Sequence, residues 1–313
     1  MEKVIVIVGP TASGKTKLSI ELAKKMNGEI VSADSMQIYK YMDIGTAKPT
    51  EEEKEGIRHY LIDEVNPDEE FSVAKYQEMA LEYIQQILEG GKFPIVAGGT
   101  GLYINSLLYN INFSETTVDW EYREELKKLA EENGNQFLHD RLKEVDPEAA
   151  SRIHSNDIKR VIRALEVFKF TNKPISHHQE LSRMIPPKYE FILIGLTMDR
   201  QKLYERINLR VDLMLENGLL QEIRKLIEMG YDKYSVAMQG IGYKELLAYL
   251  RGEMSYEEAV EIIKRESRRY AKRQLTWFRR LENIHWINLD EFSQTSEVLK
   301  NIENHIATHG IFL

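Results

Sequence analysis

The chain has 313 residues and no cysteine, which excludes disulfides and thiolate metal sites and is compatible with a reducing compartment. Hydrophobic residues make up 42% and charged residues 29%, and no apolar run approaches the ~18 residues of a membrane helix. A predicted strand follows "MEK" directly, so we expect no signal peptide, no membrane segment and a cytoplasmic protein. The net charge of −8 argues against a nucleic-acid partner only if the charge is evenly spread.

The first element is an apolar, β-branched strand at residues 3–8, and it leads into "GPTASGKT", residues 9–16. This segment fits the pattern G-x-x-x-x-G-K-[ST] and precedes a helix predicted at residues 14–26. In such a loop the backbone N–H groups hold a diphosphate, the lysine contacts its outer oxygens and the hydroxyl binds Mg²⁺. We predict diphosphate contacts from Gly9, Thr11, Ala12, Ser13, Gly14, Lys15 and Thr16, with Thr16 as the metal ligand.

A second strand is predicted to end near Ser32 or Ala33, which places Asp34 just beyond it. A helix with apolar residues at helical spacing follows at residues 71–88, and a third strand begins at Phe93. This alternation predicts an α/β fold, a P-loop NTPase-like parallel sheet with helices on both faces. If the second strand neighbours the first, Asp34 faces the P-loop, either as a general base or hydroxyl acceptor or as a turn residue.

After Asn112 only helical segments are predicted, until an apolar strand returns at Phe191–Leu196. We therefore expect an α-helical insertion domain at residues 114–187 within a core of residues 1–113 and 188–313. From Asp199 onward the sequence predicts helices, interrupted by the glycine-rich segment "AMQGIGYKE". The histidines form no metal-ligand spacing, and His59 receives no role.

Two features bear on the chemistry. No acidic residue ends an apolar strand where nucleoside-triphosphate hydrolases place one for Mg²⁺, which argues against a motor or GTPase. The segment Ile262–Arg280 carries eight basic residues and one Glu, leaving about −15 on the rest of the chain. With Trp277 among them, this segment favours a nucleic-acid surface over a solvated basic helix. The run containing Lys159, Arg160 and Arg163 is equally consistent with an ordinary surface.

Several blocks occur together in a known order: "GPTASGKT", "SADSMQIYKYMDIGTAKP", "HYLID", "GGTGLYI", "RIHSNDIKRVIRALEV", "AMQGIGYKE" and "AKRQLTWFR". From Val4 to about Trp286 the sequence closely resembles the bacterial tRNA dimethylallyltransferases. It departs from them slightly, with Gly240 where alanine is common and Ala97 where valine is usual, and it lacks the zinc-finger extension of eukaryotic relatives.

The resemblance implies transfer of the five-carbon group of dimethylallyl diphosphate to N6 of adenosine 37 in tRNA, with Mg²⁺ as cofactor. It implies that Asp34 is the general base and that Thr100 and Arg123 contact the substrates at the catalytic centre. The blocks that correspond to tRNA-contacting segments contain Asp34, Ser35, Met36, Gln37, Lys159, Arg160, Arg163, Met238, Gln239, Gly240, Gly242, Tyr243, Lys272, Arg273, Gln274, Trp277 and Arg279. The expected partners are the anticodon loop of tRNA and dimethylallyl diphosphate, and a monomer is expected.

Other functions compete with this one. A P-loop kinase of a small metabolite explains the first hundred residues but not the basic C-terminal segment. An isopentenyltransferase acting on free adenine nucleotides would use the same loop and Asp34 without needing a large basic surface. A non-catalytic RNA-binding module is disfavoured by the intact Gly14-Lys15-Thr16.

Overall fold

The computed structural model describes residues 1–110, 119–184, 186–232 and 234–312. The chain divides into two compact units, one formed by Met1–Ile104 with Tyr189–Leu313 and the other by Asn105–Lys188. The first domain boundary predicted from sequence, between residues 113 and 114, lies outside the described residues. The second, between residues 187 and 188, lies next to the observed one.

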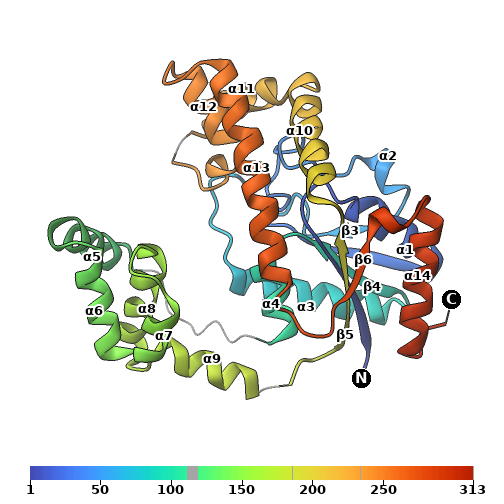
Figure 1. Ribbon diagram of the computed structural model, residues 1–313, viewed down its shortest axis with the longest axis horizontal. Helices are drawn as coiled ribbons and strands as arrows, with labels where there is room; N and C mark the ends of the chain where they lie inside the picture. The colour runs from blue at the N-terminus through green and yellow to red at the C-terminus, as the bar shows by residue number, and fades with distance from the viewer. Residues whose placement is uncertain (111–118, 185, 233, 313) are drawn as a thin grey trace. The chain divides into compact units, whose positions relative to one another are not determined.

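The larger unit is built on a six-stranded sheet, in which every pairing is parallel, with the order β3-β2-β4-β1-β5-β6 (Figure 1). The strands are β1 (Lys3–Val8), β2 (Gly28–Ala33), β3 (His59–Tyr60), β4 (Phe93–Gly98), β5 (Glu190–Thr197) and β6 (His285–Asn288). Parallel strands end at one edge of a sheet, so the turns after β1, β2 and β4 gather there. The predicted α/β class is confirmed.

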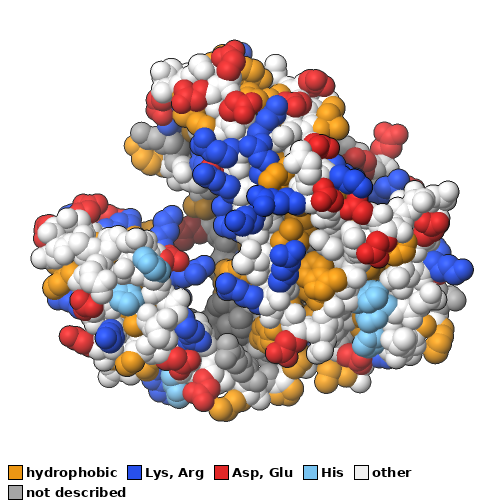
Figure 2. Space-filling view, in the orientation of Figure 1, with side chains coloured by type: hydrophobic (Ala, Val, Ile, Leu, Met, Phe, Trp, Pro, Cys, Tyr) orange, Lys and Arg blue, Asp and Glu red, His pale blue; other side chains and the backbone are white. Residues whose placement is uncertain are grey.

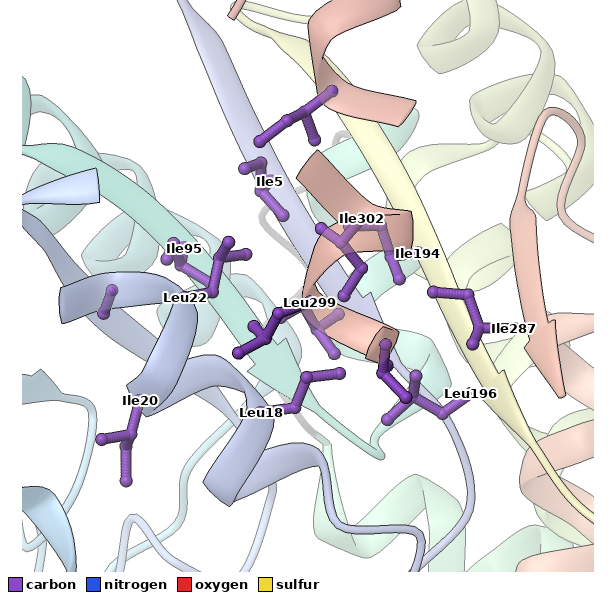
Figure 3. Packing of buried hydrophobic residues seen from close by; sticks show 14 of the residues in the cluster. Ile5, Leu18, Ile20, Leu22, Ile95, Ile194, Leu196, Ile287, Leu299 and Ile302 are labelled. Carbon is purple, nitrogen blue, oxygen red and sulfur yellow. The ribbon is translucent and has the colours of Figure 1, made fainter. Parts of the chain in front are cut away.

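Side chains on the two faces of the sheet alternate, as expected for buried strands. Ile5 of β1 is in register with Ile95 of β4 and Ile192 of β5, and all three belong to one apolar cluster. That cluster also contains Leu18 and Leu22 of helix α1 (Lys15–Met26) and the buried face of helix α14 (Thr295–Thr308) (Figure 3). Helix α3 (Val73–Glu89) packs against β2 and β4 with a different set of buried side chains.

The α-helices of the larger unit are α1 (Lys15–Met26), α2 (Glu51–Lys54), α3 (Val73–Glu89), α4 (Gly101–Leu108, shared with the second unit), α10 (Arg200–Glu216), α11 (Leu219–Glu228), α12 (Tyr243–Leu250), α13 (Tyr256–Phe278) and α14 (Thr295–Thr308). Short 3₁₀ helices lie at Ala237–Gln239 and Leu289–Glu291. Ser72 begins α3 by accepting a hydrogen bond from the backbone of Lys75, and Gly90 follows its last turn. Ser255 begins α13 in the same way.

Two short strands were not predicted. The sequence analysis expected only helices after Asp199, yet β6 pairs in parallel with β5. The other, β3, has two residues and pairs with Ile30 and Val31 of β2. Segments this short carry no readable alternation, and only their pairing partners make them strands.

The second unit is helical, as predicted, with α5 (Trp120–Asn133), α6 (Asn135–Val145), α7 (Pro147–Arg152), α8 (Ile158–Thr171) and α9 (Ile175–Met184). Its core includes Leu126, Leu138, Leu142 and Val161, which α5, α6 and α8 bury against one another. None of the described helices is long and apolar enough to cross a membrane.

Candidate active site

The P-loop lies between β1 and α1, as the sequence predicted. Gly14 begins α1 with φ 85°, a left-handed conformation that favours glycine. The Nζ of Lys15 donates a hydrogen bond to the carbonyl of Pro10 at 2.7 Å, so the lysine closes over its own loop. Burial and the nearby charge of Arg210 lower the pKa of Lys15 to about 7. A lysine at the N-terminus of a helix favours binding of an anion at this loop.

Asp34 follows the last residue of β2, as predicted. Its Oδ1 accepts hydrogen bonds from the backbone N–H of Met36 at 2.9 Å and of Gln37 at 3.3 Å, which forms an Asx turn. No hydrogen bond from the described residues reaches Oδ2. The assumption that β2 neighbours β1 is wrong, because β4 lies between them. Asp34 reaches the P-loop side nonetheless, since all three strands end at the same edge.

Thr100 connects two of the turns at this edge. Its backbone N–H donates to the carbonyl of Ala33 at 3.0 Å, and its Oγ1 accepts a hydrogen bond from the N–H of Ser35 at 2.9 Å. The turn after β4 is therefore fastened to the turn that carries Asp34. Thr100 acts on the position of Asp34 through these bonds.

One cavity brings part of the predicted site together, and neither Thr100 nor Arg123 is among its lining residues. Its lining includes Thr11, Lys15, Thr16, Ser19, Asp34, Gln37, Thr46, His59, Gly99, Arg210, Tyr270 and Gln274. The charges of Asp34 and Lys15 lie close enough to affect each other, since Asp34 raises the pKa of Lys15 while burial and Arg210 lower it more. A cavity with two cations, one carboxylate and the N-terminus of a helix is suited to an anion and a hydrogen-bond donor bound side by side.

Sequence reasoning missed Arg210 and Tyr270. Arg210 lies three residues after the buried Ile207 in α10, on the side of the helix that faces the interior. A charged residue among the inward-facing apolar positions of this helix was the sequence signal that could have identified it. Burial lowers the pKa of Arg210. Burial and the charge of Asp34 raise the pKa of Tyr270, so its phenol stays protonated as a hydrogen-bond donor.

Gln274 of the basic segment has a buried side chain. It was expected to contact tRNA, but it is only 5% exposed. Its Oε1 accepts a hydrogen bond from the N–H of Thr11 at 2.8 Å, and its Nε2 donates to the carbonyl of Gly99 at 2.9 Å. A Cβ at Gly99 would lie 2.2 Å from that Nε2, so the glycine permits the approach. Gln274 thus joins α13 to the P-loop and to the turn after β4.

Two further expected tRNA contacts have interior side chains, Met238 with 0% and Tyr243 with 1% exposure. The phenol of Tyr243 donates to Glu222 Oε1 at 2.6 Å. Trp277 is half-buried, and a Cβ at Gly101 would lie 2.4 Å from its ring, so part of the indole is used in packing. The side chains of Met238 and Tyr243 therefore pack inside the protein, whereas that of Trp277 is partly exposed.

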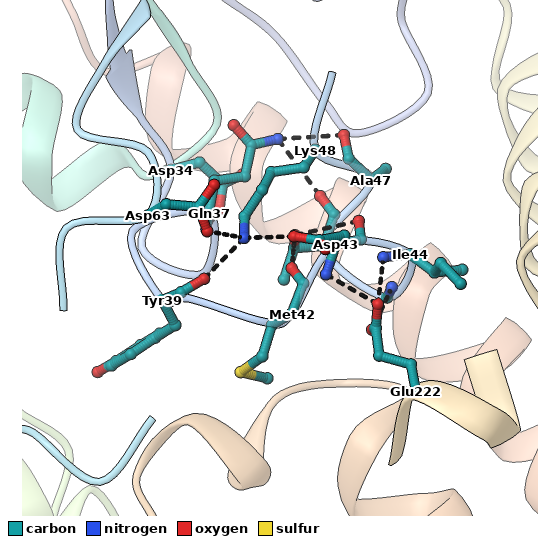
Figure 4. A network of polar contacts seen from close by, with 12 residues as sticks. Asp34, Gln37, Tyr39, Met42, Asp43, Ile44, Ala47, Lys48, Asp63 and Glu222 are labelled. Carbon is teal, nitrogen blue, oxygen red and sulfur yellow. Dashed lines mark hydrogen bonds and ion pairs between the residues drawn. The ribbon is translucent and has the colours of Figure 1, made fainter. Parts of the chain in front are cut away.

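The loop after Asp34 is fastened by a buried carboxylate (Figure 4). Glu222 accepts hydrogen bonds from the backbone N–H groups of Asp43 at 2.9 Å, Ile44 at 2.7 Å and Gly45 at 3.2 Å. On the same loop, Gln37 Nε2 donates to the carbonyls of Thr46 and Ala47. The predicted residue Gln37 is thereby oriented by its own loop.

The exposed residues of α13 form a basic surface, which Figure 2 shows as a band of Lys and Arg side chains. The exposed members of the predicted set are Lys272, Arg273 and, directly after the helix, Arg279. Toward the N-terminal half, Lys264 is paired with Asp212 at 2.7 Å and Arg269 with Glu266 at 2.7 Å. The concentration of charge predicted from the sequence is therefore present on one side of one helix.

Arg123 belongs to the second unit and opens α5. Its Nε and Nη2 both donate to the buried carboxylate of Glu166 at 2.8 Å, and Arg163 donates to the same group at 2.5 Å. Burial alone would raise the pKa of Glu166, but these hydrogen bonds lower it overall. Lys159 and Arg160 are exposed on α8, and Arg160 pairs with Asp157 at 3.3 Å.

The P-loop offers oxygen donors that would suit a divalent cation binding together with an anion. Among the described residues, no three His, Asp or Glu side chains gather as a metal site. Thr16 presents an exposed hydroxyl at the loop, and the Ser13 Oγ is buried without a described hydrogen-bond partner. Mg²⁺ keeps several waters and binds through one or two protein oxygens plus phosphates, so this donor set suits it.

Comparisons with known proteins agree with this geometry. The model of the family described as IPP transferase matches residues 37–281. A tRNA dimethylallyltransferase of Acetivibrio thermocellus is 68% identical over the whole of both chains. The full-length tRNA isopentenylpyrophosphate transferase of Bacillus halodurans is 47% identical, with a TM-score of 0.74 over 98% of this chain and 96% of that one.

A eukaryotic dimethylallyltransferase, whose crystal structures concern its action on tRNA, is 32% identical. Its TM-score is 0.81 over 99% of this chain and 80% of that one. The family model, the relatives and the solved structures together cover both the P-loop and the basic helix. The chain therefore belongs to the IPP transferase family, that of the tRNA dimethylallyltransferases.

Proposed function

We propose that the protein transfers the dimethylallyl group of dimethylallyl diphosphate to N6 of adenosine 37 in tRNA, releasing diphosphate. The observation that carries this proposal is the shared cavity, in which Asp34 lies with Lys15 of the P-loop and Arg210 of α10. In the transfer, the bond between C1 of the prenyl group and the diphosphate oxygen breaks, and a bond from C1 to N6 forms. The electron pair of the broken bond leaves with the diphosphate.

Asp34 is the base in this proposal. An exocyclic adenine amine is a weak nucleophile, and removing its proton as the new bond forms makes the attack easier. Oδ1 of Asp34 is already occupied by the N–H groups of Met36 and Gln37, so Oδ2 is oriented to accept from N6. The proton released from N6 is received at Oδ2.

Lys15, Arg210 and the N-terminus of α1 stabilise the departing diphosphate, because its negative charge grows as the C1–O bond breaks. Lys15 exchanges its bond to Pro10 for one to the anion, which raises the pKa of Lys15 from its lowered value. Thr16 would hold Mg²⁺, which when bound supplies additional positive charge to the diphosphate oxygens. The P-loop thus binds the diphosphate, which is the leaving group of the reaction.

The exposed cations of α13 are proposed to contact the phosphates of the tRNA anticodon stem and loop. Contacts of Lys and Arg with phosphates position the nucleic acid without reading its sequence. A base in a stacked loop cannot reach Asp34, so adenosine 37 is extruded into the cavity. An enzyme acting on free adenine nucleotides has no use for such a surface, and neither has a metabolite kinase.

The test supplies labelled dimethylallyl diphosphate with tRNA that lacks the modification, with AMP, and separately ATP with candidate metabolites. We expect prenylated tRNA and free diphosphate. Label transfer to AMP but not to tRNA would reject tRNA as the substrate, and ATP turnover without prenylation would favour a kinase.

Asp34→Asn tests the base, because asparagine keeps the size of the side chain and can still accept the two turn hydrogen bonds. We expect the single-turnover rate to fall at least a hundredfold, in the range of lost general-base catalysis. Asp68→Asn is the matched control, since Asp68 is an exposed aspartate that does not line the cavity. A rate for Asp34→Asn near that of the control would remove Asp34 from this role.

A further inference from the structure

His59 lines the diphosphate cavity, but nothing in the proposed mechanism uses it. It begins β3 at one edge of the sheet, opposite Ile30 of β2. Its ring shares the cavity wall with Lys15, Thr16 and Arg210. The question is which hydrogen bond its side chain makes there.

The backbone fixes the tautomer of His59. Nδ1 lies 2.9 Å from the carbonyl oxygen of Ile57. A carbonyl only accepts hydrogen bonds, so Nδ1 carries the proton and Nε2 of the neutral ring is an acceptor. Burial lowers the pKa of His59, which keeps the ring neutral at physiological pH.

Nε2 is buried and has no hydrogen-bond partner among the described residues. A buried acceptor without a donor costs about 1–3 kcal/mol, so native proteins rarely keep one unless something else supplies the donor. The charged groups outside the cavity that act on His59 are Lys54 and Glu51 of α2, and neither hydrogen-bonds to Nε2. A donor for Nε2 is therefore sought in the cavity that His59 lines.

The atoms of the diphosphate do not supply that donor, and the N6 of adenosine is assigned to Asp34. An ionised diphosphate carries only acceptors, and two lone pairs facing each other repel. A water bound to Mg²⁺ is a strong donor, because the metal polarises its O–H bonds. Thr16, which would hold the metal, lines the same cavity as His59.

We propose that His59 is a positioning residue whose Nε2 accepts a hydrogen bond from a water of the Mg²⁺ bound with the diphosphate. This inference rests on the proposed function, because it assumes a diphosphate with Mg²⁺ at the P-loop. His59 orients the hydrated metal through that water and transfers no proton. Groups that orient metal ligands in this way typically affect metal affinity ten- to a hundredfold.

Two substitutions separate the two nitrogens. In His59→Asn the amide N–H₂ replaces the Nδ1 donor toward Ile57 but leaves no acceptor at the place of Nε2. In His59→Gln the longer side chain provides an oxygen near the place of Nε2 but loses the bond to Ile57. We expect Mn²⁺ binding to the protein–pyrophosphate complex, measured by electron paramagnetic resonance, to weaken about tenfold in His59→Asn and less than threefold in His59→Gln.

Pyrophosphate binding in EDTA should be the same in His59→Asn as in the wild type, and the thermal unfolding temperatures of both variants serve as the folding control. Unchanged Mn²⁺ affinity in His59→Asn, equal losses in both variants, or a matching loss of pyrophosphate affinity in EDTA would each overturn the proposal. So would ¹⁵N NMR showing the proton on Nε2. Prenyl transfer to tRNA by the wild-type protein is measured in a separate assay. Absence of transfer would reject the proposed function, whereas the Mn²⁺ affinities of the variants test the role of His59.

Discussion

Removing the carboxylate of Glu222 is expected to release the loop that follows Asp34. In Glu222→Ala, three backbone N–H groups, those of Asp43, Ile44 and Gly45, and the phenol of Tyr243 lose their acceptor. Each buried donor left without a partner costs about 1–3 kcal/mol. Water entering the space left by the side chain satisfies some of them, so we expect a loss of about 4 kcal/mol in the free energy of unfolding.

Two milder changes give a ranking. Glu222→Gln keeps one acceptor oxygen but turns an N–H₂ group toward the donors, and we expect a loss of about 2 kcal/mol. Tyr243→Phe removes one donor and leaves Glu222 its backbone bonds, with a loss of about 1 kcal/mol. At roughly 2–3 °C per kcal/mol for a unit of this size, the unfolding temperature falls by about 10, 5 and 2 °C in that order.

Hydrogen exchange measured by mass spectrometry on peptides covering residues 38–50 tests the cause. The amides of 43–45 should exchange faster in Glu222→Ala and Glu222→Gln, while peptides from α14 should not change. Prenyl transfer should fall in the same order, because the loop orients Gln37 through the carbonyls of Thr46 and Ala47. Unaltered exchange of 43–45 in Glu222→Ala, or a Glu222→Gln variant more stable than wild type, would refute the reasoning.

Five further predictions concern the site and its surroundings. The pKa of Lys15 is lowered to about 7, so its side chain is mostly neutral at pH 8. We therefore expect pyrophosphate binding to take up roughly one proton per site. Calorimetry in buffers of different ionisation enthalpy measures this uptake, which should be lost in Lys15→Met. Between pH 7 and 10 the unfolded chain keeps the proton on Lys15, whereas the folded protein has lost it. The free energy of unfolding of the free wild-type protein should therefore rise with pH over this range, and Lys15→Met should lack this contribution. Gln274→Leu should weaken pyrophosphate binding five- to thirtyfold, about 1–2 kcal/mol, because the P-loop loses its bond to α13; unchanged binding would contradict this. Glu166→Gln should destabilise the helical unit by about 3–5 kcal/mol and speed exchange in α5 and α8, since two arginines lose a buried counter-charge. In Lys272→Ala, the slope of log tRNA affinity against log salt concentration should become shallower by about 0.7–0.9. Lys264→Ala is the control and should change the slope less, because Lys264 is already paired with Asp212. Equal slopes in the two variants would count against the basic surface.

The sequence by itself determined the local elements and the chemistry they carry. The β-branched run before Gly9 and the Gly14-Lys15-Thr16 triplet specify a strand, a phosphate loop and a helix within sixteen residues, because short-range sterics and periodicity decide them. The position of Asp34 at a strand end follows from the same local pattern. The positive charge of α13 can also be read from the sequence, because it depends only on the number of lysines and arginines in that segment.

Only the tertiary structure decided which of these residues work together. The order of the strands placed β4 between β1 and β2, and with it Thr100 beside the turn of Asp34. The packing of α10 and α13 brought Arg210 to the cavity and turned Gln274 inward, away from the partner that its basic neighbours suggest. Local sequence fixes dihedral angles and the spacing of apolar residues, whereas these contacts join residues 65 or more positions apart. They are set by how the helices and strands pack, which no single stretch of sequence contains.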